Sequence, residues 1–345
     1  MALLANMDLL AQEKCETTEG PLWNDEEQAL YWVDIPAGKL YRHEPGTGET
    51  RLVISAGGSV GGYTFQRDGS MLLFGDNGAV RLLRDGALTT LREEIEDEAG
   101  ARFNDVIADP EGRVFCGTMP HDKRPGRLYR LDHDGELTLL LEDAGLSNGM
   151  GFSPELTHFY HTDSDKGTIT RFNYDYRTGE ISRPTVIATI PAADGVPDGM
   201  AVDSVGTIWS AIWDGSNLVR FGPDGTIMEK VWFPARKVSS VTFGGPDYRD
   251  AYVTLAGGND PDNEGGSAGA VYKADLGVSG RAPFRSNIDP SGSGWSAPLV
   301  RAQVLMDWEA AAKAAAEGSA NVIPAQAPPP PPKRSDEAPW KKRGI

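Results

Sequence analysis

Two stretches, NGMGFSPELTHFYHTDSDKGTITRFNYDYRTGE at residues 148–180 and DGMAVDSVGTIWSAIWDGSNLVRFGPDG at residues 198–225, follow one pattern along their whole length. In each, a short apolar strand leads to a polar turn, and a second strand rich in aromatic and β-branched residues follows. A Gly or Asn turn then precedes a third strand, and a turn of the type DG or TGE ends the unit. Such strands, separated by turn residues, are typical of an antiparallel meander.

The same pattern recurs four more times, in GPLWNDEEQALYWVDIPAGKLYRHEPGTGE (20–49), GGYTFQRDGSMLLFGDNGAVRLLRDG (61–86), NDVIADPEGRVFCGTMP (104–120, continuing to GRLYRLDHDG) and SVTFGGPDYRDAYVTLAGG (240–258, continuing to GAVYKADLG). Repeats of about 40–50 residues, each with four short strands, are the signature of a β-propeller. A β-sandwich, the competing architecture, does not require repeats in register. The sequence therefore predicts an all-β, six-bladed β-propeller over residues 1–287. Residues 9–15 are expected to add a strand to the last blade and close the ring.

The composition changes after residue 287, so residues 288–345 are interpreted as a C-terminal extension. Residues 301–317 are rich in alanine and are expected to form a helix that ends at Gly318. The proline run at 328–332 and the basic tail after it are expected to be flexible.

Composition also limits the partners. A net charge of −17 disfavours nucleic acid and anionic membranes, because both repel an acidic surface. Two cysteines in 345 residues form no disulfide framework, and the first residues do not resemble a signal peptide. We expect a cytoplasmic protein without a transmembrane segment, acting on a small molecule as a monomer or weak homodimer.

Residues at equivalent positions carry the predicted chemistry. The residue just before the first strand of each repeat is, in order, Glu19, Gly61, Asn104, Asn148, Asp198 and Ser240, at intervals of 42, 43, 44, 50 and 42. In a propeller the innermost strands line the central channel, so these positions form a ring at one of its mouths. Three residues of the ring, Glu19, Asn148 and Asp198, offer oxygen donors with a total charge of −2. Such a set suits a hard divalent cation such as Ca²⁺, Mg²⁺ or Mn²⁺. Glu19, Asn148 and Asp198 are therefore the predicted metal ligands, and three ligands leave positions open for water or substrate.

The competing interpretation is structural, because Asp, Asn and Gly at strand starts are common turn formers. Only the register across the repeats favours a metal site over six ordinary turns. The five histidines form no ligand set, and His161 and Asp163 are interpreted as structural or surface residues.

The chain resembles the gluconolactonase and regucalcin (senescence marker protein) family, which includes luciferin-regenerating enzymes. The resemblance rests on EGPLW (19–23), LYWVDI (30–35), RFNDVIADPEGR (102–113), GTMP (117–120), SNGMGFSP (147–154), GVPDGMAVD (195–203) and FGGPDYRDAYVT (243–254). It implies a six-bladed propeller with one divalent cation, which is Ca²⁺ or alternatively Mg²⁺, Mn²⁺, Zn²⁺ or Fe²⁺. It places the metal ligands on Glu19, Asn148 and Asp198, the substrate contacts on Arg102 and Asn104, and implies hydrolysis of a sugar lactone.

Asp198 is expected to act as the general base, because a carboxylate on a cation keeps a second oxygen for proton transfer. Arg102 has a structural alternative, an ion pair with Glu94 or Glu98. The loop after GTMP is short and shows no clear counterpart of the acidic residue with which some family members contact substrate, which leaves the substrate open. The alternative functions are a phosphotriesterase-like hydrolase and a non-catalytic, metal-stabilised propeller that binds a ligand.

Overall fold

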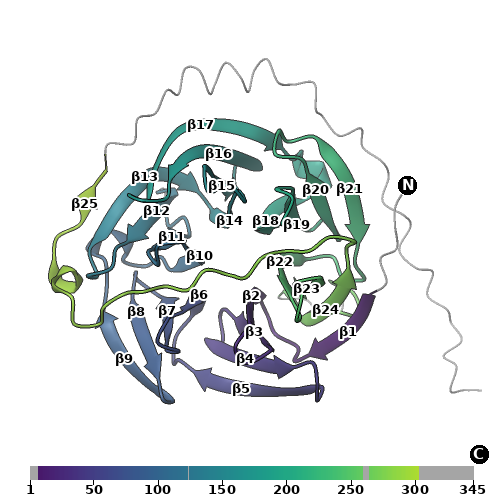
Figure 1. Ribbon diagram of the computed structural model, residues 1–345, viewed down its shortest axis with the longest axis horizontal. Coiled ribbons are helices and arrows are strands. Elements are labelled where there is room, and N and C mark those ends of the chain that lie inside the picture. Colours follow the sequence, from purple (N-terminus) through teal and green to yellow (C-terminus); the bar gives the residue numbers. More distant parts are fainter. Residues whose placement is uncertain (1–6, 123, 259–263, 303–345) are drawn as a thin grey trace, which may run out of the picture.

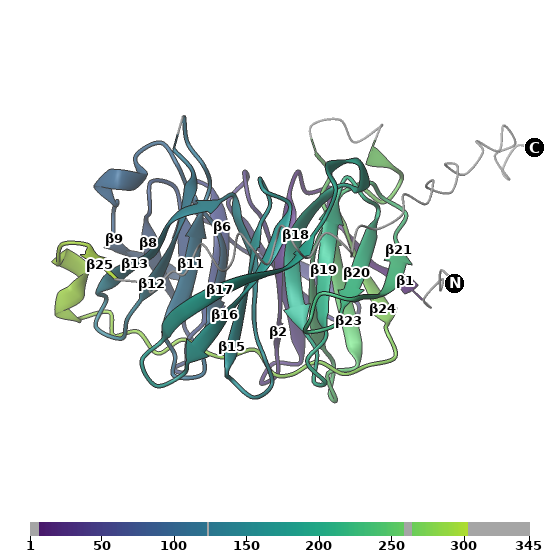
Figure 2. The ribbon, with the colours of Figure 1, turned by 90° about the horizontal axis from the view of Figure 1, so that it is seen from above.

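The strands form six sheets around a central axis, as the repeats predicted (Figures 1 and 2). The structure is a computed structural model that describes residues 7–122, 124–258 and 264–302. Each sheet is built on an antiparallel meander. Short 3₁₀ helices occur at Glu96–Glu98, Ala192–Asp194 and Ser293–Ser296.

The six blades follow one another along the chain. Blade 1 consists of β2 (Thr18–Asn24), β3 (Ala29–Asp34), β4 (Lys39–Glu44) and β5 (Glu49–Ser55). Blade 2 consists of β6 (Val60–Phe65), β7 (Met71–Gly75), β8 (Val80–Arg84) and β9 (Ala87–Arg92). Blade 3 consists of β10 (Phe103–Ala108), β11 (Val114–Thr118), β12 (Gly126–Leu131), β13 (Leu137–Gly145) and β25 (Val300–Arg301).

The second half of the ring repeats this order. Blade 4 consists of β14 (Ser147–Phe152), β15 (His158–Asp163), β16 (Thr168–Asp175) and β17 (Glu180–Thr189). Blade 5 consists of β18 (Val196–Val202), β19 (Ile208–Trp213), β20 (Asn217–Phe221) and β21 (Ile227–Trp232). Blade 6 consists of β22 (Val238–Gly244), β23 (Asp250–Leu255), β24 (Ala270–Asp275) and the early strand β1 (Met7–Gln12). The innermost strand of each sheet is β2, β6, β10, β14, β18 or β22.

The core lies between neighbouring blades. Every residue of β3 and β11 is buried, because both faces of these second strands pack against adjacent sheets. The outermost strand β5 is largely exposed. This gradient explains why the second strand of each repeat is the most aromatic and β-branched part of the sequence.

Strand β1 closes the ring, as expected for the N-terminal segment. It pairs antiparallel with β24, with Met7 opposite Ala274 and Gln12 opposite Ala270. The observed strand lies slightly earlier than the predicted residues 9–15. Closure joins the first described strand to the last blade and so ties the two ends of the repeat array together.

The segment that follows β24 crosses one face of the propeller, here called the underside (Figures 1 and 2). Its backbone hydrogen bonds reach blade 2 and then blade 3, from Ser286 N to Phe65 O at 2.8 Å and from Asn287 N to Gly112 O at 2.8 Å. It ends as β25, which runs parallel to β13 and covers its free edge. Arg301 is therefore extended where the sequence predicted a helix to begin. Residues 303–345, which hold the rest of that helix and the proline run, lie outside the described residues.

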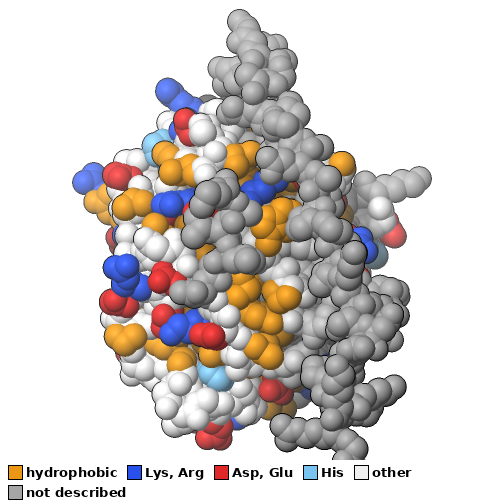
Figure 3. Space-filling view, turned by 90° about the vertical axis from the view of Figure 1, so that its right-hand side faces the viewer, with side chains coloured by type: hydrophobic (Ala, Val, Ile, Leu, Met, Phe, Trp, Pro, Cys, Tyr) orange, Lys and Arg blue, Asp and Glu red, His pale blue; other side chains and the backbone are white. Residues whose placement is uncertain are grey.

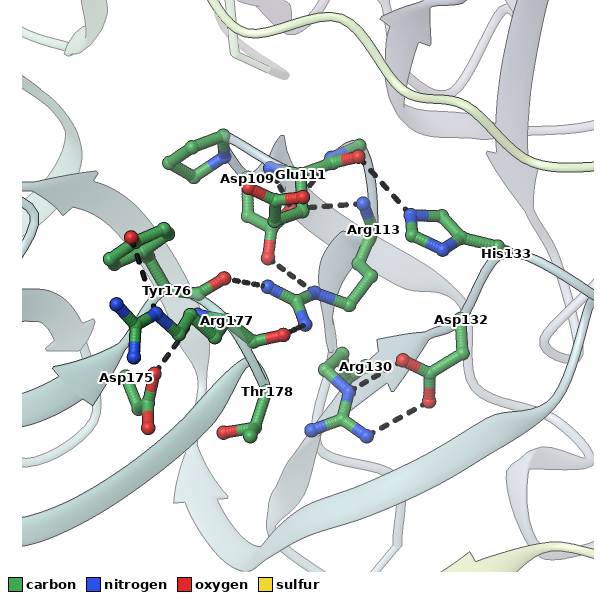
Figure 4. A network of polar contacts seen from close by, with 12 residues as sticks. Asp109, Glu111, Arg113, Arg130, Asp132, His133, Asp175, Tyr176, Arg177 and Thr178 are labelled. Carbon is green, nitrogen blue, oxygen red and sulfur yellow. Dashed lines mark hydrogen bonds and ion pairs between the residues drawn. The ribbon is translucent and has the colours of Figure 1, made fainter.

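A buried ion pair of blade 3 is hydrogen-bonded to blade 4 at the underside (Figure 4). Asp109 is fully buried and its Oδ2 accepts hydrogen bonds from Arg113 Nε at 2.6 Å and from Tyr174 Oη at 2.9 Å. Arg113 Nη1 also donates to the carbonyl of Arg177 at 3.0 Å. The DPEGR stretch (residues 109–113) thus has a structural role. It follows the end of β10 that lies opposite the residues of the predicted ring.

The outer wall on the side of β1 and β21 carries apolar side chains with charged ones between them (Figure 3). Leu9 on β1 and Met228 on β21 are among the exposed large apolar residues. Apolar residues scattered among charges are normal on a protein surface. No helix in the described residues is long and apolar enough to cross a membrane.

Candidate active site and metal-binding ring

The three predicted metal ligands all lie where an inner strand is bulged. The pairing register shifts between Glu19 and Leu22 in β2, between Asn148 and Met150 in β14, and between Pro197 and Met200 in β18. A bulge interrupts the regular alternation of side chains and re-aims those beside it. The bulges lie at the end of the channel opposite the underside, here called the upper mouth.

The glycines that follow two of these ligands allow the inner strands to approach closely. A Cβ on Gly149 would lie 2.4 Å from the carbonyl oxygen of Asp198, and a Cβ on Gly199 would lie 2.1 Å from Ser240 Oγ. No side chain fits at such distances. The recurring ligand–Gly pairs are therefore a packing requirement of the ring, and they bring Asn148 and Asp198 together.

Asn148 and Asp198 are in direct contact. Both are buried, and Asn148 Nδ2 donates to Asp198 Oδ1. The same nitrogen lies 3.2 Å from Ser164 Oγ, which donates to the carbonyl oxygen of Pro197 at 2.6 Å. Ser164 thus connects the backbone beside Asp198 to the side chain of Asn148, a contact that no sequence pattern predicts.

One carboxylate oxygen of Glu19 is buried without a hydrogen-bond partner among the described residues. Its Oε2 accepts a hydrogen bond from Gly20 N at 2.5 Å, whereas its Oε1 is buried and has no hydrogen-bond partner among the described residues. Burial raises the pKa of Glu19 well above its ordinary value, and the charges of Asp198 and Asp105 raise it further. A buried carboxylate oxygen without a donor is costly unless a cation or proton compensates it.

Asp105 is an acidic residue of the site that the sequence analysis missed. It follows Asn104 on β10, where the register shifts between Phe103 and Val106. Burial raises the pKa of Asp105 to about 7. Burial also raises the pKa of Asp198, and the charge of Asp105 raises it further. Three carboxylates therefore interact in the channel, which is more negative charge than the predicted ligand set contains.

Arg102 and Asn104 lie together at the upper mouth beside this acidic group. Arg102 Nη1 donates to Asn104 Oδ1 at 2.8 Å and to the carbonyl of Phe103 at 2.8 Å. Asn104 Nδ2 donates to the carbonyl of Ser147 at 3.0 Å. Burial lowers the pKa of Arg102, which the charges of Asp76, Glu19 and Asp198 partly offset.

Glu98, one of the two acids considered as an ion-pair partner of Arg102, is paired elsewhere. Its side chain is fully buried, and it accepts from Arg124 Nη2 at 2.7 Å and from Tyr129 Oη at 2.6 Å. The described residues give Arg102 no ion pair within 4.0 Å, so its donors are directed to Asn104 and to the backbone.

A cavity of about 160 Å³ lies in the channel below the ring. Its wall consists of the next residues along the inner strands, such as Met150, Met200 and Phe243, and residues 281–284 of the crossing segment line it at the underside. Asp105 is part of the wall, but Glu19, Asn148 and Asp198 are not. The wall of this cavity has both apolar and polar groups, and Arg102 and Asn104 offer further polar groups at the upper mouth.

The residues present fit a hard divalent cation. Among the described residues no three His, Cys, Asp or Glu side chains gather closely enough to hold a metal. A site built from Glu19 and Asp198 therefore needs a neutral oxygen donor, which Asn148 carries. Oxygen ligands of this kind suit Ca²⁺ or Mg²⁺ and do not suit metals that prefer thiolate.

Comparison with known proteins finds relatives that match most of the propeller. A family model described as SMP-30/Gluconolactonase/LRE-like region matches residues 17–257. The pentonolactonase XacC of Haloferax volcanii is 43% identical over 281 residues, which cover 79% of this chain and 96% of that protein. Regucalcin of Xenopus laevis is 32% identical and covers 80% of this chain and 97% of its own length.

Solved structures show the same fold. A luciferin-regenerating enzyme superposes with a TM-score of 0.75 at 25% identity and covers 82% of this chain and 100% of its own. A calcium-binding regucalcin of Agrobacterium tumefaciens superposes with a TM-score of 0.76 at 24% identity and covers 83% of this chain and 98% of its own.

Proposed function

Since the chain belongs to the SMP-30/gluconolactonase/LRE-like family, we propose that it is a metal-dependent hydrolase that opens a sugar lactone to the aldonic acid. The observation that carries the proposal is the buried Oε1 of Glu19 beside Asp198, which has no hydrogen-bond partner in the part of the chain that the structure describes. The high identity to a pentonolactonase, along nearly all of that protein, favours a lactone of a sugar as the substrate.

Glu19, Asn148 and Asp198 would hold the cation. In the structure Asn148 Nδ2 faces Asp198, so binding through Oδ1 requires the amide to turn. When bound, the cation would polarise the ester carbonyl and stabilise the negative charge that develops on its oxygen. It would also offset the repulsion among the carboxylates of the channel.

The side chains at the upper mouth would orient the substrate and move the proton. Arg102 keeps donors beyond those used on Asn104 and Phe103, and a rigid guanidinium fork can bind lactone hydroxyls or the carbonyl. Asn104 keeps one amide hydrogen for the same purpose. Asp198 takes a proton from the attacking water as the C–O bond forms, and it returns the proton to the ring oxygen as the ester bond breaks.

The test is acid release from a panel of aldonolactones by metal-stripped protein, before and after addition of Ca²⁺, Mg²⁺, Mn²⁺, Zn²⁺ or Fe²⁺. Metal-dependent release above the spontaneous rate is expected for the wild type, and Asp198→Asn should lose most turnover while still folding. Asp165→Asn, at an exposed position in the turn after Ser164, is the matched control and should retain turnover.

Two results would overturn the proposal. Full activity in Asp198→Asn would remove the assigned base. No turnover with any lactone and metal would reject the lactonase, and a parallel assay with a phosphotriester would then separate another hydrolase from a ligand-binding propeller.

A further inference from the structure

His161 is a buried histidine that belongs to none of the roles assigned above. It lies on β15 with 3% of its surface exposed, and its Nε2 is 2.8 Å from Ser147 Oγ. Ser147 is the first residue of β14, is fully buried, and directly precedes Asn148. The contact therefore joins the second strand of blade 4 to the beginning of its innermost strand.

The backbone carbonyl of Ser147 binds Asn104 of the neighbouring blade. Its carbonyl accepts from Asn104 Nδ2 at 3.0 Å, and Asn104 Oδ1 accepts from Arg102 Nη1 at 2.8 Å. The four residues form a continuous chain of hydrogen bonds from blade 4 to blade 3. Both ends of the Asn104 amide are occupied, so its orientation depends on where the Ser147 carbonyl stands.

The position of Ser147 is restricted from both sides. A Cβ added to Gly117 on β11 would lie 2.1 Å from Ser147 Oγ, so the backbone of blade 3 touches the hydroxyl. His161 is the hydrogen-bonding partner of that hydroxyl. Loss of the imidazole would leave a buried hydroxyl unsatisfied and would favour displacement of the strand start.

Neither residue of this contact fits a direct chemical role. Ser147 has no exposed surface, so its hydroxyl cannot reach a substrate as a nucleophile. Burial lowers the pKa of His161 to about 3, so the ring is neutral and offers only hydrogen bonds. Their function must be exerted through the residues they contact.

We propose that Ser147 and His161 are positioning residues that set the orientation of Asn104, and through it Arg102, for binding the lactone. The inference rests on the proposed function for its substrate, but the orientation of Asn104 can be measured without any substrate. The pair acts on the substrate side of the site, because its hydrogen bonds lead to Asn104 and Arg102 and not to Glu19 or Asp198.

The first experiment compares His161→Phe with His161→Gln. Phenylalanine retains the volume and removes the hydrogen bond, whereas glutamine can place a polar atom near that of Nε2. His161→Phe should raise KM for the lactone about tenfold with kcat changed less than threefold, the size expected when one hydrogen-bonding group is misplaced. His161→Gln should restore KM toward the wild-type value. His158→Phe, on the same strand, is the matched control and should leave KM unchanged, because among the described residues the imidazole of His158 hydrogen-bonds only to Thr157.

The second experiment needs no turnover. In protein labelled with ¹⁵N-asparagine, the side-chain amide of Asn104 should exchange its protons slowly in the wild type and faster in His161→Phe and in Ser147→Ala. Asn104→Asp identifies the resonance. Unchanged exchange in both variants would overturn the positioning role, whatever the enzyme's substrate.

Calorimetric titration with Ca²⁺ separates the remaining outcomes. Metal affinity in His161→Phe within threefold of the wild type, together with the raised KM, supports the proposal. An unchanged KM in a folded His161→Phe, or a parallel loss of metal affinity and KM, would overturn it, the latter because the pair would then serve Asn148. Altered amide exchange in a protein that hydrolyses no lactone would leave the positioning intact and reject only the proposed substrate.

Discussion

Asp105→Asn should stabilise the metal-free protein at neutral and alkaline pH. The substitution keeps the shape of the side chain and removes one of three interacting carboxylates in the channel. Burial raises the pKa of Asp105 from 3.8 to about 7. Since one pKa unit corresponds to about 1.4 kcal/mol, keeping this carboxylate ionised in the folded protein costs about 4 kcal/mol above pH 7.

The sign of the pH dependence follows from linkage. Because the folded pKa lies above the unfolded one, the native state binds more protons between pH 3.8 and 7, and stability falls as pH rises through this range. At pH 5 the cost is about 2 kcal/mol, and at pH 8 it is about 4 kcal/mol. The advantage of Asp105→Asn should therefore be about twice as large at pH 8.

The assay is thermal unfolding of chelator-treated protein followed by circular dichroism. A domain of this size changes its Tm by about 2 °C per kcal/mol, so the variant should melt about 8 °C higher at pH 8 and about 4 °C higher at pH 5. Saturating Ca²⁺ should remove most of this difference at pH 8, since a ligand at 1,000 times its Kd adds about 4 kcal/mol to the wild type. The variant has less charge with which to attract the cation.

The reasoning would be refuted if metal-free Asp105→Asn melted no higher than the wild type at pH 8, or if its gain were the same at both pH values. Asp165→Asn provides the baseline, because Asp165 is exposed in the turn after β15. Its Tm difference from the wild type should be near zero at both pH values.

Three further substitutions test other parts of the structure. Ser164→Ala should weaken Ca²⁺ affinity several-fold in calorimetry, since it removes the hydroxyl that donates to the carbonyl of Pro197 beside Asp198, and unchanged affinity would contradict this role. Asp109→Ala should cost about 3–5 kcal/mol of unfolding free energy in urea, because Arg113 keeps a buried charge without its partner, while KM of the folded enzyme stays the same. Phe284→Ala should cost about 1–3 kcal/mol through lost contact with Phe152 and should not change KM; a changed KM would mean that the underside communicates with the upper mouth.

The repeats predicted the fold well, because blade architecture depends on patterns that every blade shares. Even the irregular fourth repeat, which lacks a Gly in its first turn, keeps the geometry. Leu156 takes the position of the missing glycine with φ of 57°, its N–H donates to Ser153 O at 2.9 Å, and its side chain packs against the core between blades 3 and 4. Tertiary packing there outweighs the local preference for glycine.

The crossing segment could not be predicted from the same patterns. Residues 276–302 have few periodic apolar positions, and their conformation follows from surfaces that exist only once the ring has formed. Ser286 pairs with backbone groups of blade 2, and β25 pairs with the edge of β13. A segment whose partners are distant in sequence leaves little local signal of its path, which explains why a helix was expected at Arg301.

The register of the repeats predicted only part of the acidic site in the channel. One residue per repeat was selected on the premise that equivalent positions of the innermost strands meet at one mouth of the channel, and this premise led to Glu19, Asn148 and Asp198. A bulge breaks the alternation of side chains along a strand, so two successive residues of β10 can both take part in the site, and Asp105 joins Asn104 there. The same bulge gives Asn104 its contact with Ser147, and so with His161, which no repeat pattern contains. Prediction of such a site therefore needs the positions of the bulges as well as the period of the repeats.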